Sequence, residues 1–67
     1  MAVMMKEFIE RVKREELVET KKYRYIRKEF HEVDSFGIRI ERLPLTALGT
    51  TDAINGWETV YEEKYYI

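Results

Sequence analysis

The spacing of apolar residues changes along this chain from a helical period at its start to a two-residue alternation in its second half. From Met4 to Val12 the five apolar residues are separated by one, three, one and three positions, which places them on one side of an α-helix. Residues 36–42 instead alternate apolar and polar side chains, as half-buried strands do, and residues 57–67 are rich in the aromatic and β-branched residues that strands favour. One amphipathic helix followed by alternating strands predicts an α+β fold.

The predicted elements can be placed along the chain from these periods. The helix is expected over about residues 3–16, where charged residues occupy the side opposite the apolar stripe. Three strands are expected over about residues 20–32, 36–43 and 57–66. A long connection covers residues 44–56. The predicted architecture is an N-terminal amphipathic helix packed on a three-stranded antiparallel sheet, and the expected helix contacts are Ile38, Ile40, Trp57 and Tyr61.

The segment of residues 20–33 fits two structures. Some of its apolar residues are three, four and three positions apart, as on one face of a helix: Tyr23, Ile26, Phe30 and Val33. The strand is preferred because tyrosine and isoleucine favour strands and no capping residue opens a second helix. The change of phase between Tyr25 and Ile26 then indicates a bulge, or a strand with neighbours on both sides.

The size of the chain limits how it can be stabilised. Residues 1–67 are expected to form one small domain, because so short a chain buries only about 60% of its unfolded surface and cannot divide its core. It has no cysteine for a disulfide bond and one histidine, which is too few for an ordinary structural zinc site. Small domains can also gain stability by burying surface against a second copy, so a homodimer stays open.

A basic and aromatic segment, KKYRYIRK at residues 21–28, is the most unusual stretch. Basic side chains bind a phosphate backbone and aromatic rings stack on single-stranded bases, so single-stranded nucleic acid is an alternative partner. The residues that would bind it are Lys21, Lys22, Arg24 and Arg27, with Tyr23 and Tyr25 as stacking residues.

The overall charge favours a structural role for this segment instead, in which its basic side chains pair with acidic side chains of the same sheet. The isoelectric point of about 5.8 is well below that of typical nucleic-acid-binding domains. Residues 1–28 have nine Lys or Arg against five Asp or Glu, a net of +4, whereas residues 29–67 have three against eight, a net of −5. The expected cross-strand pairs join Glu58 and Glu62 to Arg24 and Lys28.

The sequence offers little for catalysis, metal binding or cofactor binding. A nucleophile needs a base within reach, and His31 and Ser35 lie too close along the chain to form a triad with Asp34. Glu29 and His31 are metal-ligand types at i and i+2, but two further suitable ligands are missing. Glycine-rich nucleotide-binding motifs are absent from the sequence. We therefore predict no catalytic residue, no metal and no cofactor.

The C-terminal segment Lys64–Ile67 holds three large apolar residues in succession. It is expected either to complete the core as an edge strand or to pair with a strand of a partner or a second copy. The nine aromatic residues of the chain also exceed what one face of a three-stranded sheet can hide. Some of four tyrosines are therefore expected to be exposed or to be buried by a partner: Tyr23, Tyr25, Tyr65 and Tyr66.

The leading functional hypothesis is a small non-enzymatic protein–protein interaction module, in the manner of a regulator or a virus-encoded inhibitor. Its predicted contact residues are Tyr23, Tyr25, Arg27, Tyr65 and Tyr66, with residues 46–55 as a second surface. No apolar run is long enough for a signal sequence or a membrane span, so a cytoplasmic protein without membrane contact is expected. A small-molecule pocket between helix and sheet is a further alternative.

Overall fold

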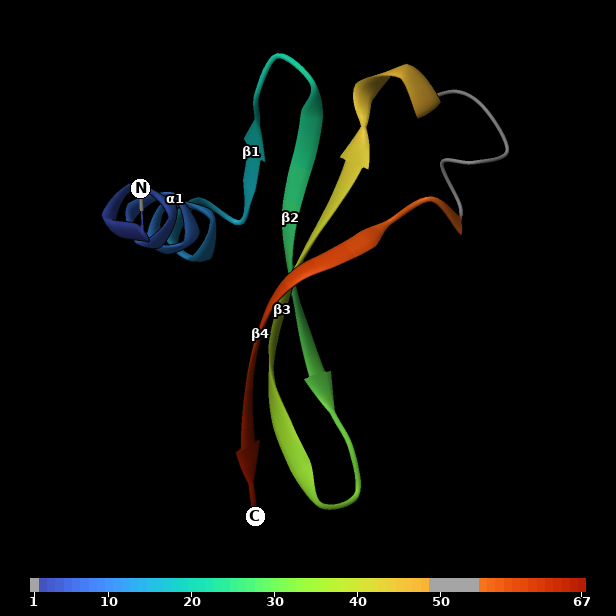
Figure 1. Ribbon diagram of the computed structural model, residues 1–67. Coiled ribbons are helices and arrows are strands. Elements are labelled where there is room, and N and C mark those ends of the chain that lie inside the picture. The colour runs from blue at the N-terminus through green and yellow to red at the C-terminus, as the bar shows by residue number, and fades with distance from the viewer. Residues whose placement is uncertain (1, 49–54) are drawn as a thin grey trace.

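The computed structural model describes residues 2–48 and 55–67, with side chains from residue 6 onward. In this part of the chain one helix packs against one antiparallel sheet, which confirms the α+β prediction (Figure 1). The elements are α1 (Ala2–Glu15), β1 (Leu17–Glu19), β2 (Tyr23–His31), β3 (Ser35–Pro44), the 3-10 helix η1 (Leu45–Ala47) and β4 (Glu58–Tyr66). The strands lie side by side in the order β1-β2-β3-β4.

The sheet has a fourth strand that the sequence analysis missed. The short strand β1 pairs with β2, with Val18 opposite Tyr25. Three residues are too few for an alternating pattern to show, so β1 was taken for part of the connection. Its presence gives β2 neighbours on both sides, as one of the two alternatives at Tyr25 and Ile26 required, and the pairing of β2 with β3 runs past these residues without a bulge.

The core lies between α1 and the middle of the sheet. Val12 of α1, Val18 of β1 and Ile40 of β3 are buried and form its centre. The partly buried side chains that pack against them are Phe8, Ile9, Tyr25 and Tyr61. The expected places of Ile40 and Tyr61 under the helix are therefore confirmed.

The other two expected helix contacts, Ile38 and Trp57, are not among the side chains that form the core, for separate reasons. A bulge interrupts the pairing of β3 with β4, since Ile40 lies opposite Tyr61 but Glu41 lies opposite Thr59. The extra residue reverses the faces of the residues before it, so Trp57 is no longer in phase with Tyr61. Ile38 lies farther along β3 and lines a hollow beyond the helix.

The C-terminal end of α1 is tied to β2. Glu16 follows the helix with a φ of 71°, and its N–H donates to the carbonyl of Val12 at 2.8 Å. The guanidinium of Arg27 donates to the Lys13 carbonyl at 2.7 Å and to the Glu16 carboxylate at 2.8 Å. A cation at this position satisfies a terminal carbonyl and opposes the helix dipole.

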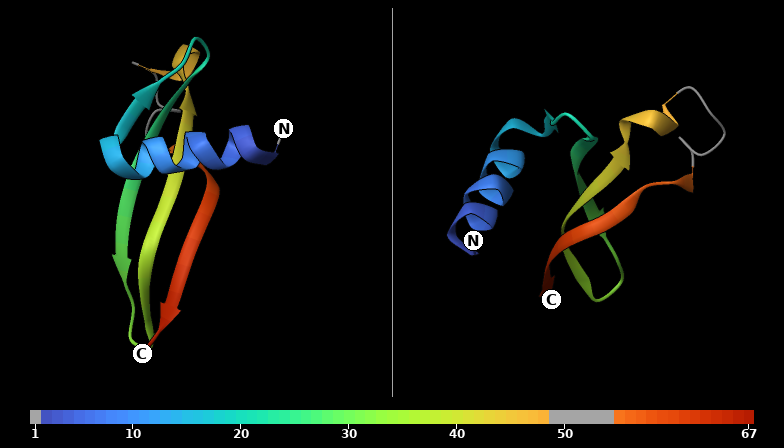
Figure 2. Two further views of the ribbon diagram at one scale, coloured as in Figure 1. Left: turned by 90° about the vertical axis from the view of Figure 1, so that its left-hand side faces the viewer. Right: turned by 45° about the horizontal axis from the view of Figure 1, so that its top comes forward.

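The helix runs across the strands, so it covers only part of the sheet (Figure 2). A helix is about 10 Å wide with its side chains, which equals about three residues of a strand. The strands β2, β3 and β4 have nine, ten and nine residues. The hairpin end of β2 and β3 and the C-terminal end of β4 therefore extend beyond the helix.

The predicted long connection begins with η1, and its residues 49–54 lie outside the described residues. Most of the second surface predicted over residues 46–55 lies there too.

Candidate protein-binding surface

A cluster of polar groups fixes α1 to β4 beside the uncovered part of the sheet. The ammonium group of Lys13 donates to the Glu63 carboxylate at 2.6 Å. The hydroxyls of Tyr61 and Tyr65 donate to the same carboxylate at 2.7 and 3.0 Å. The hydrogen bond from Lys13, followed by that from Tyr61, lowers the pKa of Glu63 from 4.5 to about 2. Glu63 in turn raises the pKa of both tyrosines.

This cluster predicts a loss of stability in acid. Because the folded-state pKa of Glu63 lies below 4.5, its contribution is complete above about pH 4.5 and is lost as the pH falls toward about 2. We expect a contribution of about 2 kcal/mol, allowing for screening by solvent at side chains that are 27 and 20% exposed. Urea unfolding at several pH values measures it.

Glu63→Gln tests the assignment. It should lower the free energy of unfolding at neutral pH by a similar amount and should flatten its dependence on pH in the acid range. The matched control is Glu7→Gln, which changes an exposed glutamate on α1. An unchanged acid dependence in Glu63→Gln would show that other carboxylates govern acid unfolding.

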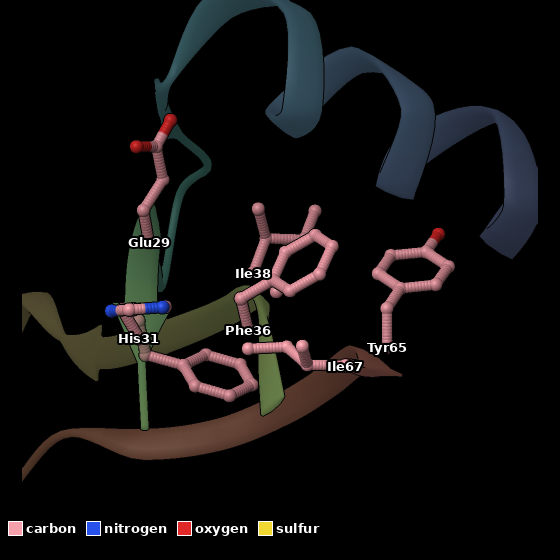
Figure 3. A pocket seen from close by; sticks show the side chains of 8 residues that line it. Glu29, His31, Phe36, Ile38, Tyr65 and Ile67 are labelled. Carbon is pink, nitrogen blue, oxygen red and sulfur yellow. The ribbon is translucent and has the colours of Figure 1, made fainter. Parts of the chain in front are cut away.

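An apolar hollow opens on the same face of the sheet, just beyond the helix (Figure 3). Its volume is about 640 Å³, and it is lined by Glu29, Phe30, His31, Phe36, Gly37, Ile38, Tyr65 and Ile67. The rings of Phe36 and Tyr65 lie 5.7 Å apart. Phe36, Tyr65 and Ile67 remain 46, 52 and 80% exposed, so large apolar side chains stand in solvent around this hollow.

The strand register brings the lining residues together from distant parts of the chain. His31, Phe36 and Tyr65 lie opposite one another in a row across β2, β3 and β4. Glu29 and Ile38 belong to the next row. Directly opposed residues share one face of a sheet, and this is the face that α1 covers farther along.

The structure separates the five predicted contact residues. Tyr65 lies at the hollow, whereas Tyr66 lies exposed on the opposite face of β4. Tyr25 packs edge-on against Phe8 with ring centres 4.7 Å apart. Tyr23 lies under the Arg42 guanidinium, whose carbon is 4.3 Å from the ring centre. With Arg27 at the end of the helix, only the two C-terminal tyrosines of the predicted set are largely open to a partner.

The basic segment of β2 is paired with carboxylates, as the overall charge suggested, but the expected partners are wrong. Arg24 pairs with Glu19 of β1, and Lys28 pairs with Glu41 of β3 at 3.3 Å. Strand β3 separates β2 from β4, so the acids of β4 reach β3 instead. Glu58 pairs with Arg42 at 3.1 Å and Glu62 pairs with Arg39 at 2.7 Å.

The remaining basic residues of that segment lie at its beginning. Lys21 and Lys22 are exposed in the turn between β1 and β2. Of the four predicted nucleic-acid-binding residues, Lys21 and Lys22 therefore take no part in the ion pairs between the described strands.

Sequence reasoning missed Phe36 and Ile38 as partner-binding residues. The sequence did contain a signal for these residues. The strands were predicted to be longer than one helix is wide, so one helix could not cover their whole length. The alternation in residues 36–42 was used only to place these side chains in the core.

The groups considered for catalysis and metal binding have ordinary surroundings. The buried Ser35 hydroxyl donates to Glu32 at 3.4 Å, and the exposed His31 lies at the hollow. Within residues 2–48 and 55–67, no cluster of three metal-ligand side chains occurs. In the same ranges, no helix has the length and apolar character needed to cross a membrane. The chain matches no protein-family model, no curated protein and no solved structure.

Proposed function

We propose that this chain is a small, non-enzymatic protein-binding module, and that the apolar hollow is its contact surface. The observation that carries the proposal is the exposure of Phe36, Tyr65 and Ile67 side by side around the hollow. Exposed apolar residues that gather on one face mark interaction sites more often than scattered ones do. Aromatic anchors of this kind supply much of the binding energy in protein interfaces.

The rim of the hollow indicates the chemistry of the partner. Glu29 is exposed at one side of the hollow, with the Arg27 guanidinium 3.7 Å away, and His31 lies next to it. A partner segment with one large apolar side chain and a neighbouring lysine or arginine would fill the hollow and pair with Glu29. By binding such a segment, the protein would act as a regulator or inhibitor of its partner.

The proposal predicts that Phe36→Ser weakens partner binding at least about tenfold, since truncation of an interface anchor costs more than about 1 kcal/mol. The measurement is a selection of displayed random peptides, followed by titration of the enriched peptides against each variant. Val33→Ser is the matched control, because Val33 is a fully exposed apolar residue in the same hairpin. Circular dichroism checks that both variants fold.

Enriched peptides should combine a large apolar residue with a basic one, and should bind the wild type and Val33→Ser equally. Peptides that bind Phe36→Ser as tightly as the wild type would remove the hollow as the contact surface.

Single-stranded nucleic acid remains the second candidate, on the strength of Lys21 and Lys22. Their exposure in one turn provides two phosphate contacts. Binding through them should fall steeply with salt and should be lost in Lys21→Ala with Lys22→Ala. The hollow would be dispensable for it, so Phe36→Ser distinguishes the two functions.

A further inference from the structure

Strand β4 lies at one edge of the sheet in the part of the chain that the structure describes. An edge strand presents unpaired N–H and C=O groups that readily pair with another strand. Several large apolar side chains on or directly after this strand are exposed: Val60, Tyr65, Tyr66 and Ile67. A strand paired at this edge would cover part of their surface.

The bulge in β4 limits how a second strand can align with it. The ladder is regular only from Tyr61 onward, because Val60 is the extra residue. If a second copy pairs antiparallel about a two-fold axis perpendicular to the sheet, both copies turn their helix-covered face to the same side. Residues directly opposite each other across the two β4 strands must then come from the same face of β4. The axis can then pass through Glu62, Glu63 or Lys64.

Charge selects among these three registers. An axis at Lys64 places two lysines opposite each other and sets Glu62 against Tyr66. An axis at Glu62 places two glutamates opposite each other and leaves only three residues of regular ladder. Each of the three registers sets two like charges opposite each other at its axis, so the residues beside the axis decide between them. Only an axis at Glu63 brings opposite charges into direct opposition, which stabilises a strand pair.

We infer that β4 pairs antiparallel with β4 of a second copy, with the two-fold axis at Glu63. In this register each Glu62 lies opposite Lys64 of the other copy, and each Tyr61 lies opposite Tyr65. Opposite charges and aromatic pairs in direct opposition each stabilise a strand pair, so β4 is complementary to itself in this register.

The two Glu63 carboxylates at the axis carry their own counter-charges. Each accepts a hydrogen bond from Lys13 of its own chain at 2.6 Å. Two lysines therefore stand beside the two glutamates, and the repulsion is compensated within each copy.

The position of the helix fits the same pairing. The N-terminal end of α1 extends past the edge of β4 (Figure 2, left). In the dimer this end projects toward the second copy. The two helices lie on the same face because the axis is perpendicular to the sheet.

This inference goes beyond the proposed function, since it concerns the edge of β4 and not the hollow. Tyr65 belongs to both surfaces, so the test uses Glu62 and Lys64, whose side chains point to the opposite face from the hollow. Glu62→Lys alone and Lys64→Glu alone each replace two attractive pairs with two repulsive ones. Each should weaken the dimer by about tenfold or more.

A mixture of the two variants provides the control within the experiment. In the mixed dimer both pairs are again opposite in charge, so the mixture should associate about as well as the wild type while each variant alone stays monomeric. Sedimentation velocity over a range of protein concentrations measures all four samples. Effects on the ion pairs of Glu62 with Arg39 and of Lys64 with Glu32 within one chain cannot produce this restoration.

A cysteine experiment tests the register independently. The natural chain has no cysteine. Glu62→Cys mixed with Lys64→Cys should form the mixed disulfide faster than either variant forms its own. Lys28→Cys on β2 is the control and should not cross-link. A wild type that stays monomeric at every concentration, or a dimer whose mixed variants gain nothing over the single ones, would overturn the inference. Peptide binding at the hollow is measured separately and can survive that result.

Discussion

Gly37→Ala is expected to lower the free energy of unfolding by about 3 kcal/mol, the upper part of the usual range for overpacking. A β-carbon at this position would overlap the carbonyl oxygen of Glu63 and would lie 2.9 Å from its carbonyl carbon and 3.2 Å from the α-carbon of Lys64. These atoms belong to the backbone of β4, so no side-chain rotation relieves the contact. Strand β4 would have to move away from β3.

Chemical unfolding followed by circular dichroism measures the effect of Gly37→Ala. The control is Val33→Ala in the same hairpin, where a fully exposed side chain is shortened and little change is expected. Gly37→Ala should also disturb the hollow, since Gly37 lies in its wall. Wild-type stability in Gly37→Ala would mean that β3 and β4 lie farther apart in solution than this structure places them.

Ile40→Ala is expected to cost about 3 kcal/mol, because Ile40 is completely buried and its truncation leaves a cavity under the helix. A domain of this length has about 3–10 kcal/mol of stability in total, so the variant should lose at least about a third of it. The matched control is Ile67→Ala, the same chemical change at a residue that is 80% exposed.

Thermal unfolding distinguishes these two isoleucine variants. Ile40→Ala should melt well below the wild type, and Ile67→Ala should melt close to it. Similar melting temperatures for both would show that the centre of the core lies elsewhere. Because Ile67 lines the hollow, its variant should still reduce partner binding.

Most of the secondary structure was predictable because it is encoded in local periods. The helix was expected over about residues 3–16 and spans Ala2–Glu15, and the strand expected over about residues 36–43 spans Ser35–Pro44. Strand β1 was missed because its pairing partner, not its own three residues, makes it a strand. The bulge at Val60 was missed for the same reason, since a bulge is a property of two strands.

The candidate surface was predictable only in part. The exposure of some tyrosines was predictable from the surplus of aromatic residues, and the structure shows that Tyr65 and Tyr66 are the ones largely exposed. The burial of Tyr25 against Phe8 does not, because both faces of β2 carry aromatic side chains and only the docked helix distinguishes them. Arg27 likewise looked free for a partner until the end of α1 was placed beside it.

The sequence by itself determined the class of the fold, the extent of its main elements and the use of charges for pairing within the sheet, but not which charges pair. These follow from periodicity, turn residues and the balance of charge, which act over a few neighbouring residues. Only the tertiary structure decided that α1 crosses the strands, where the bulge falls and which apolar residues stay in solvent around Phe36. Those features depend on contacts between residues distant in the chain, such as Lys13 with Glu63, whose partners no local pattern specifies.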